Sequence, residues 1–478
     1  MRRRHCLVII TDYNGIVKKN YSREAQSIHF LGIGGIGVSA LAGIMHAKGK
    51  IVTGNDKETS SLVYSLVQKG IFVSIGEAPL PLADVIVYSL AIPKNNAQLA
   101  AARKKNIPVM TYPEAVGELS KEYRTISVCG THGKSTITAL ISKVLLENNF
   151  DPNVIVGTKL KELGNANYRV GKSALLVLES CEYKRAFLNY HPQTIVCNNV
   201  EPDHLDYYTD EQDYVSAFQE FASLLPRDGY FFANLDSENV HEVLKTLQEK
   251  GLSAYNTFTY SMQYPSADYY LKGNDIFKKG VIIGKLDLKI PGTHNRSNAL
   301  AAFAVCSTFG IAPNDILNSL NSYKGAFRRF ELKGTVGKTI VIDDYGHHPT
   351  EIRATLQAAH ERYPKAKICV VFQPHQYSRT KHFLDDFAAS FEEASSVIIP
   401  NIYAARDTKN DMHSVRAEDL VEAIKKNKTH ALFGNGMEET LTYLRTHAAS
   451  FDVIITMGAG NVGSIADSLV TASHHKSL

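Results

Sequence analysis

The sequence has few cysteines, no long apolar run and no concentration of charge of one sign. Its six cysteines lie far apart and include no C-x-x-C pair, which argues against a disulfide framework and favours free thiols in a reducing compartment. No stretch approaches the roughly 20 apolar residues that a membrane-spanning helix needs. The apolar run in "MRRRHCLVII" is also too short for a signal-peptide core. These absences predict a cytoplasmic protein without a membrane segment.

The charge balance gives no support to a nucleic-acid-binding or membrane-surface role. The formal net charge of +4 is small for 478 residues, whereas such roles need a concentrated basic face. Hydrophobic residues make up 44% and charged residues 21% of the chain, as in soluble globular proteins. We expect small molecules as partners, and a chain that acts as a monomer or a homodimer.

Short apolar runs that end in Gly, Asp, Asn or His, each followed by a helix-like segment, recur along the chain. This alternation predicts an α/β fold with parallel sheets, in which the chemistry lies at the carboxyl ends of the strands. The length suggests about three domains of roughly 150 residues each. We expect an N-terminal extension followed by three domains, at residues 1–27, 28–122, 123–327 and 328–478.

A first glycine-rich loop, "GIGGIG", lies between an apolar strand-like run and a helix-like segment. Its glycines form a G-x-G-x-x-G pattern, and Asp56 follows at the distance where a Rossmann fold places its ribose-binding acid. Glycines let the backbone approach a diphosphate, and the helix N-terminus attracts it. The loop suits NAD and a UDP-sugar equally and leaves the reaction open. It predicts a diphosphate site formed by Gly32, Gly34, Gly35, Gly37 and Asp56.

A second loop, "CGTHGKSTIT", has the features of a shortened phosphate loop. Val128 stands where the pattern G-x-x-x-x-G-K-[ST] requires glycine. The loop still follows a strand-like run and starts a helix-like one. In that context N–H groups face an anion, a lysine reaches the outer phosphates and a hydroxyl binds Mg²⁺. We expect ATP to be bound by Gly130, Thr131, His132, Gly133, Lys134, Ser135 and Thr136.

Two later strand ends offer further ligands for a magnesium ion. Glu179 ends the run "ALLVLE", and His204 lies in "NNVEPDHLD". Mg²⁺ prefers carboxylate and water, so Glu179 is the best single candidate, while histidine is a less usual ligand. For His204 a capping or packing role at a turn is an equal alternative. The central segment is thus predicted to be an ATP and Mg²⁺ site.

Nine blocks in a fixed order resemble those of the Mur ligases, which are ATP-dependent amide ligases of peptidoglycan precursor synthesis. The match covers nearly all of the chain after about residue 27, and the ordered set is far more specific than any single block. The blocks are "HFLGIGGIGVSALA", "VCGTHGKSTITA", "LESCEY", "NNVEPDHLDYY", "PGTHNRSNALAA", "GAFRRFE", "DDYGHHPTEI", "VFQPHQYSRT" and "MGAGNV".

The resemblance implies three domains and a reaction. The domains would be an N-terminal Rossmann-like one for UDP, a central P-loop ATPase-type one with a mixed or parallel sheet, and a C-terminal Rossmann-like one for the amino acid. The carboxylate of UDP-N-acetylmuramate would attack the γ-phosphate of ATP to form an acyl phosphate. The amine of L-alanine would then displace phosphate and leave an amide.

The resemblance also implies roles for residues in the first two domains. Lys134 would grip the β- and γ-phosphates, and Ser135, which directly follows it, would bind a first Mg²⁺. Glu179 and His204 would hold a second Mg²⁺ between the γ-phosphate and the substrate carboxylate. Asn295 would contact the adenine or ribose side of ATP.

Further implied roles fall near or beyond the predicted second boundary. Arg329 and Arg379 would contact the acyl phosphate or the amino-acid carboxylate, because a guanidinium fork suits an anion. Arg329 would also lie at ATP, where Asp344 would orient a partner. For Arg328 a solvated position is equally open. The L-alanine pocket would be shaped by Tyr345, His347 and His348, one histidine of which could accept the amine proton, although a structural histidine beside Pro349 is an alternative.

Some residues depart from the family pattern, and other functions compete with the ligase. Lys184 and Ala186 stand where Asp and Ser are usual, and Arg406 and Asp407 where Gly and Glu are common. These departures leave glycine and L-serine open as alternative amino acids. The competing functions are a related ligase for another nucleotide-linked carboxylate, as in murein-peptide recycling, an NAD-linked oxidoreductase and a nucleotide-gated binding protein.

Overall fold

The computed structural model of the protein describes residues 24–251, 256–405 and 407–474. Arg406 and all but the last four residues of the predicted N-terminal extension lie outside these ranges. Within them the chain divides into two compact units. The first comprises the described residues of Met1–Glu201, Glu211–Tyr260 and Ala304–Ile311, and the second those of Pro202–Asp210, Ser261–Phe303 and Ala312–Leu478.

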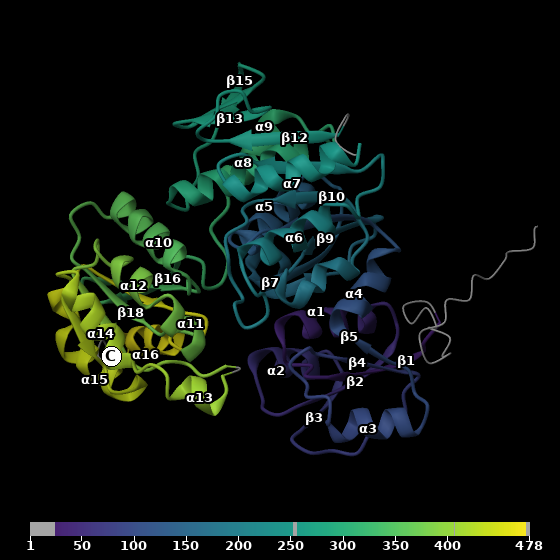
Figure 1. Ribbon diagram of the computed structural model, residues 1–478, viewed down its shortest axis with the longest axis horizontal. Helices are drawn as coiled ribbons and strands as arrows, with labels where there is room; N and C mark the ends of the chain where they lie inside the picture. Colours follow the sequence, from purple (N-terminus) through teal and green to yellow (C-terminus); the bar gives the residue numbers. More distant parts are fainter. Residues whose placement is uncertain (1–23, 252–255, 406, 475–478) are drawn as a thin grey trace, which may run out of the picture. The chain divides into compact units, whose positions relative to one another are not determined.

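The first unit begins with a five-stranded sheet in which every neighbouring pair is parallel (Figure 1). The strand order β3-β2-β1-β4-β5 is that of a Rossmann-type sheet without its sixth strand. The first strand is buried along almost its whole length, as expected of a parallel strand covered on both faces. The elements are β1 (Ser27–Leu31), α1 (Ile36–Ala47), β2 (Ile51–Asp56), α2 (Ser61–Gln68), β3 (Phe72–Ile75), β4 (Val85–Tyr88), α3 (Ala97–Lys104), β5 (Val109–Thr111) and α4 (Tyr112–Ser120).

A second set of strands in the first unit has the order β12-β11-β10-β6-β9-β7-β8. All neighbours are parallel except β7 and β8. The elements are β6 (Arg124–Cys129), α5 (Lys134–Glu147), β7 (Asn153–Leu160), the 3₁₀ helix η1 (Lys161–Leu163), β8 (Ala166–Arg169), β9 (Leu175–Glu179), the 3₁₀ helix η2 (Tyr183–Asn189), β10 (Pro192–Cys197), α6 (Glu211–Ala222), β11 (Tyr230–Asn234), α7 (Glu238–Glu249) and β12 (Thr257–Ser261). The parallel neighbours β9, β6 and β10 bring three strand ends to one edge.

The second unit contains three antiparallel strands, β13 (Tyr269–Lys272), β14 (Asp275–Lys278) and β15 (Val281–Lys285). Its other sheet has the order β16-β17-β21-β18-β19-β20, and only the β16–β17 pair is antiparallel. The strands are β16 (Glu331–Val336), β17 (Thr339–Asp344), β18 (Ile368–Phe372), β19 (Ser396–Ile399), β20 (Ala431–Phe433) and β21 (Val453–Met457). Helix α8 (Thr293–Ser307) begins in this unit and ends in the first.

The six-stranded sheet is covered by helices on both faces. In β18, Val370 and Phe372 join one hydrophobic cluster while Cys369 and Val371 join another, because successive side chains point to opposite faces. The remaining helices are α9 (Pro313–Asn321), α10 (Pro349–Arg362), α11 (Tyr377–His382), α12 (Leu384–Ala389), α13 (Lys409–Met412), α14 (Ala417–Lys426), α15 (Met437–His447), the 3₁₀ helix η3 (Ala448–Ser450) and α16 (Gly463–His474).

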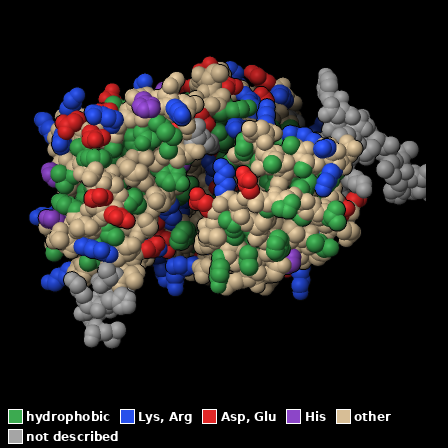
Figure 2. Space-filling model, turned by 90° about the horizontal axis from the view of Figure 1, so that it is seen from below, with side chains coloured by type: hydrophobic (Ala, Val, Ile, Leu, Met, Phe, Trp, Pro, Cys, Tyr) green, Lys and Arg blue, Asp and Glu red, His purple; other side chains and the backbone are tan. Residues whose placement is uncertain are grey.

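These sheets confirm the predicted α/β fold with mainly parallel strands. On the face shown in Figure 2, basic and acidic side chains are interspersed among polar and hydrophobic atoms. Among the described residues, no helix combines the length and the hydrophobicity needed to cross a membrane.

Candidate active site

The first glycine loop and Asp56 lie together, as the sequence predicts. Asp56 is the last residue of β2, and its Oδ2 accepts a hydrogen bond of 2.7 Å from the Gly34 backbone N–H. A Cβ atom at Gly34 would lie 2.9 Å from that same oxygen, so glycine makes room for the carboxylate. Gly32 has a φ of +73°, a left-handed conformation that favours glycine. Gly35 then caps α1, and a Cβ at Gly37 would lie 2.6 Å from the Tyr112 ring.

The phosphate loop runs from the end of β6 to the start of α5. Gly130 and Gly133 have φ values of +138° and +80°, which explains why both are glycine. Asn199, which follows β10, supports the loop from one side. Its side-chain oxygen accepts a 2.7 Å hydrogen bond from the His132 N–H, and its carbonyl accepts one of 3.0 Å from the Thr131 N–H.

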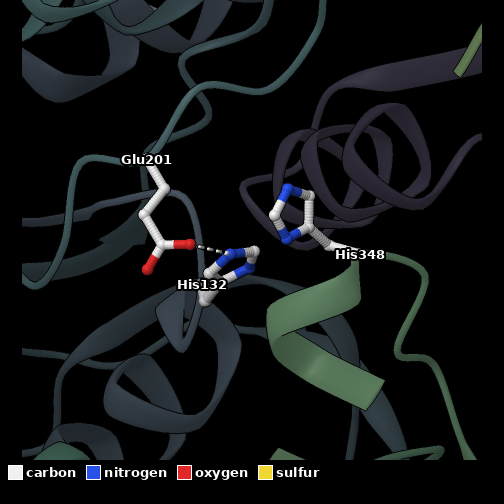
Figure 3. Close-up of side chains that lie close together, drawn as sticks. All are labelled: His132, Glu201 and His348. Atoms are coloured by element: carbon white, nitrogen blue, oxygen red, sulfur yellow. Dashed lines mark ion pairs between the residues drawn. The ribbon is translucent and has the colours of Figure 1, made fainter. Parts of the chain in front are cut away.

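The Thr131 and His132 side chains are directed at protein groups. The Thr131 hydroxyl lies 2.9 Å from the Tyr214 hydroxyl and donates to the Glu201 carbonyl at 2.8 Å. The His132 Nε2 lies 3.4 Å from the Glu201 carboxylate, toward which Figure 3 shows the ring pointing. These contacts, together with the hydrogen bonds from both N–H groups to Asn199, hold the loop in place.

Lys134, the first residue of α5, folds back over the loop. Its ammonium donates to the carbonyls of Gly130 and Thr131, at 2.5 and 2.9 Å, and to the Glu182 carboxylate at 3.1 Å. Burial alone would lower the pKa of Lys134, but the Glu182 carboxylate more than offsets this and raises it above its usual value. The lysine is therefore a charged donor held against the carbonyls of the loop.

Ser135 and Glu179, beside the lysine, bring two side-chain oxygens together. The Ser135 hydroxyl donates to Glu179 Oε1 at 2.9 Å, and Oε2 accepts from the Gly157 N–H at 2.6 Å. A Cβ atom at Gly157 would lie 2.7 Å from Glu179 Oε1, so glycine at this position leaves room for the carboxylate. Hydroxyl and carboxylate oxygens are the hard ligands that Mg²⁺ prefers, and the pair fits such an ion. Thr136 is buried in the first turn of α5.

His204 belongs to the second unit, in the segment Pro202–Asp210. Its backbone is left-handed, with a φ of 55°, and its N–H donates to Asp203 Oδ1 at 2.6 Å. A shared metal role for His204 and Glu179 stays a prediction.

Asp203 and Arg379 form a buried ion pair in the second unit, with both side chains only 6% exposed. Burial by itself would raise the pKa of Asp203, but the Arg379 guanidinium outweighs it and holds that pKa well below its usual range. The sequence predicts Arg379 as a ligand of an anion. The structure supplies a protein carboxylate as its partner, which the motif by itself did not indicate.

The two histidines of "DDYGHHP" have different surroundings. His348 caps α10 by accepting a hydrogen bond from the Thr350 N–H at 3.3 Å, so it fills the structural role considered as the alternative. His347 Nδ1 lies 3.1 Å from the Tyr345 carbonyl. Burial lowers the pKa of His347 to about 4, so this ring is neutral near pH 7 and is a weaker base than an exposed histidine.

Asp344, Tyr345 and Arg329 lie together at the end of β17. Asp344 accepts hydrogen bonds of 2.7 Å from the N–H groups of Gly346 and Phe330, and burial raises its pKa. The Arg329 guanidinium lies 5.2 Å from the centre of the Tyr345 ring. These contacts place three predicted site residues in one cluster of the second unit.

Arg328 is not the solvated side chain that the sequence left open. Its guanidinium donates to the Asp343 carboxylate at 2.8 Å and to the carbonyls of Gly458 and Gly460 at 2.6 and 2.9 Å. It therefore ties the start of the C-terminal sheet to the loop after β21. Asn295, in the first turn of α8, is buried and donates to the Pro291 carbonyl at 2.6 Å.

Two of the residues that depart from the family pattern, Lys184 and Asp407, lie in segments with defined local contacts. Lys184 and Arg185 both have a φ of 53°, a conformation that non-glycine residues adopt only when neighbouring contacts hold it. Arg185 supplies those contacts by donating to Asp213 and Glu220 of α6, at 2.7 and 2.8 Å. Asp407 accepts a 3.1 Å hydrogen bond from the Ser378 N–H.

Sequence reasoning missed Glu182 and Tyr214 as neighbours of the phosphate loop. Glu182 stands in the quoted block "LESCEY", but it comes three residues after the strand end that drew attention to Glu179. Tyr214 lies on α6, in no block at all. What distinguishes Glu182 is its burial beside the loop lysine, and burial is not visible in the sequence.

Three family models match the chain in order. "Mur ligase family, catalytic domain" matches residues 27–124, "Mur ligase middle domain" matches 128–306, and "Mur ligase, glutamate ligase domain" matches 328–460. The boundaries of the three domains remain predictions.

Curated relatives and solved structures agree with these matches. Proteins named UDP-N-acetylmuramate–L-alanine ligase from Acetivibrio thermocellus and Caldanaerobacter subterraneus are each 39% identical over 92% of this chain and cover 95% and 96% of their own lengths. The crystal structure of UDP-N-acetylmuramate-alanine ligase from Thermotoga maritima has a TM-score of 0.79 at 25% identity, over 94% of this chain and 99% of that one. A murein peptide ligase from Psychrobacter arcticus, at 22% identity and a TM-score of 0.70, shares the fold.

The likeness to the Thermotoga maritima structure confirms the predicted α/β architecture of three domains. The family models together span well over half of the chain, and the relatives exceed a third identity over most of it. The resemblance seen in the nine sequence blocks is thereby confirmed, and the chain belongs to the Mur ligase family.

Proposed function

We propose that the protein joins the carboxylate of UDP-N-acetylmuramate to the amine of L-alanine, with hydrolysis of ATP, in peptidoglycan precursor synthesis. The observation that supports this most directly is the assembly of Lys134, Ser135 and Glu179 around a glycine loop at a helix start. The relatives that match nearly the whole chain are named for this same reaction. The substrates are small molecules.

The first step is phosphoryl transfer. A carboxylate oxygen of UDP-N-acetylmuramate attacks the γ-phosphorus, the bond to the β–γ bridging oxygen breaks, and ADP leaves. Catalysis of such a transfer is mainly positioning and stabilisation of charge. Lys134 supplies a positive charge to the outer phosphates, and the N–H groups in the first turn of α5 hold them at the helix N-terminus.

Magnesium would be held by Ser135 and Glu179, with His204 as a further candidate ligand. When bound, the ion neutralises charge on the phosphates and reduces their repulsion of the substrate carboxylate. The ligands' own contribution is geometric. The Gly157 N–H holds one Glu179 oxygen, which leaves the other directed at the Ser135 hydroxyl.

The second step is attack by the amine. The nitrogen of L-alanine attacks the acyl carbon, phosphate leaves with the carbon–oxygen bond electrons, and the nitrogen loses a proton. The candidate base in the second unit is His347, which burial keeps neutral and at the same time makes a weak base. Arg379 and Arg329 provide positive charge for the amino-acid carboxylate or the acyl phosphate.

The first glycine loop, with Asp56, would hold the UDP part of the substrate. We expect Asp56→Ala to raise the KM for UDP-N-acetylmuramate by roughly 10- to 100-fold, because a charged hydrogen-bond acceptor is lost, while kcat changes little. Steady-state kinetics at saturating ATP and L-alanine measure this.

Asp56→Asn is the matched control, because an amide oxygen can still accept from the Gly34 N–H that Asp56 now holds. A smaller rise for asparagine than for alanine would separate support of the loop from loss of the charge. An unchanged KM in the alanine variant would remove Asp56 from the uridine site.

The proposed function is tested by phosphate release from ATP and Mg²⁺ with UDP-N-acetylmuramate, in the presence and absence of L-alanine, glycine or L-serine. We expect release that depends on both partners, and an amide product identified by mass. Release with a different amino acid would correct the specificity and leave the reaction class in place.

No release with any of the three amino acids would contradict the proposal and favour another nucleotide-linked carboxylate as substrate. An NAD-linked oxidoreductase accounts for the first glycine loop but leaves the Lys134, Ser135 and Glu179 assembly without a use. Retention of these three residues equally disfavours a binding protein without turnover. A cytoplasmic location and a monomeric or homodimeric state remain our predictions.

A further inference from the structure

The Glu182 carboxylate is buried against the phosphate-loop lysine. Its side chain is 1% exposed, and its two oxygens lie 3.1 and 3.0 Å from the Lys134 ammonium. Glu182 follows β9, the neighbour of β6 in the sheet, so the pairing of the two strands brings it to the loop. The roles in phosphate and magnesium binding proposed above fall to Lys134, Ser135 and Glu179, and none of them falls to Glu182.

The surrounding contacts hold this carboxylate in place. The buried Tyr214 hydroxyl donates to Glu182 Oε1 at 3.4 Å. It also lies 2.9 Å from the Thr131 hydroxyl of the loop. The Glu182 carbonyl accepts from the Arg185 N–H at 2.8 Å, and the Arg185 guanidinium is bound to α6, the helix that carries Tyr214. Glu182 is therefore fixed from both its side chain and its backbone.

The lysine has no spare hydrogen in this arrangement. An ammonium carries three hydrogens, and the Lys134 ammonium has three acceptors, namely two loop carbonyls and Glu182. A phosphate that binds Lys134 must displace at least one of them. Displacing Glu182 from Lys134 would leave a buried carboxylate without the positive charge that offsets its loss of hydration. This is costly in a medium of low dielectric constant.

A second cost arises even if the pair stays intact. Phosphates bound to Lys134 would share its ammonium with the Glu182 carboxylate, whose oxygens lie 3.1 and 3.0 Å from it, so the like charges would repel one another. A divalent cation on the phosphates removes most of their charge and with it this repulsion. The penalty imposed by Glu182 thus falls mainly on nucleotide that carries no metal.

We propose that Glu182 determines the specificity of the phosphate loop for metal-bound over metal-free nucleotide. This inference rests on the proposed function in one respect, that the loop containing Lys134 binds the phosphates of ATP. Glu182 acts through Lys134 and does not itself touch the substrate, so it is a positioning and specificity residue.

The test measures nucleotide binding rather than turnover. Dissociation constants of a fluorescent ATP analogue are determined for the full-length protein with excess Mg²⁺ and with EDTA. In the unmodified protein, we expect the dissociation constant in EDTA to be at least about tenfold larger than the one with Mg²⁺. In Glu182→Gln, which keeps the shape and removes the charge, we expect binding in EDTA to tighten about tenfold and binding with Mg²⁺ to change less than about threefold.

Further variants separate charge from general damage. Glu182→Met, a second neutral variant, should behave like the glutamine variant, and Glu182→Asp, which keeps the charge, should retain the preference of the unmodified protein. Glu122→Gln is the matched control, because it removes the partner of another partly buried lysine, Lys48, at 2.7 Å in the same unit. It should leave both constants unchanged. A variant that merely harms the fold would bind more weakly under both conditions.

Two results would overturn the inference. One is equal affinity of the unmodified protein in Mg²⁺ and EDTA, which needs no variant to fold. The other is an unchanged ratio of the two constants in a folded neutral variant. Failure of the unmodified protein to bind nucleotide under either condition would instead contradict the proposed function of the loop.

Discussion

Replacing Lys134 with alanine is expected to lower kcat for amide formation by about 10²- to 10³-fold or more while the fold remains intact. The estimate follows from the loss of one preorganised charge at the position where negative charge is redistributed during phosphoryl transfer. The side chain is partly exposed, at 15%, and its acceptors are two loop carbonyls and Glu182. Phosphate release at saturating substrates measures kcat, and circular dichroism verifies the fold.

Lys143→Ala is the matched control for this prediction. Lys143 lies on the same helix, α5, where it pairs with Glu147 rather than with the loop. Its removal should leave kcat within about twofold of the unmodified value, as expected for a substitution away from the site. Turnover of the Lys134 variant at a near-normal rate would show that this loop does not perform the transfer.

Replacing Glu179 with glutamine should produce the other large loss. The substitution keeps one side-chain oxygen, which can accept from the Gly157 N–H, and its amide nitrogen can donate to the Ser135 hydroxyl, but the negative charge beside Ser135 is lost. Loss of an outer partner of a metal site already costs roughly 10- to 100-fold in affinity or activity, so loss of a direct ligand should cost more. We expect phosphate release at moderate Mg²⁺ to fall by more than about 100-fold, with partial recovery at high Mg²⁺.

A magnesium titration of the rate distinguishes this explanation from simple damage. The apparent constant for Mg²⁺ should rise in Glu179→Gln and stay unchanged in the control Glu147→Gln, whose carboxylate lies at the far end of α5 and is half exposed. A loss of rate with an unchanged Mg²⁺ dependence would argue that Glu179 does not bind the metal.

Much of the fold and of the phosphate site was predictable because the signals are local. The turn from β6 into α5 needs glycine at Gly130 and Gly133, whose φ values are positive, and a lysine at the helix start follows from the chemistry of phosphates. Parallel strands can also be recognised in the sequence, because burial on both faces makes their apolar runs continuous. Asp56 was found in the same way, from its spacing after "GIGGIG".

The partners of the charged residues were not predictable. Arg379 pairs with Asp203, 176 residues earlier in the chain, and Lys134 pairs with Glu182, 48 residues later. Arg328 binds carbonyls of a loop 130 residues away. No spacing rule connects such residues, because their proximity depends on how segments far apart in the chain pack together.

The sequence by itself determined where the backbone can bind phosphates, because glycine conformations, helix starts and the lysine next to them are properties of a few consecutive residues. Only the tertiary structure decided which carboxylates face those groups. Strand pairing places Glu179 beside Ser135 and Glu182 beside Lys134, and their burial makes the charges interact strongly. The local motif therefore specifies where an anion can bind, and tertiary packing determines which carboxylates lie beside that site.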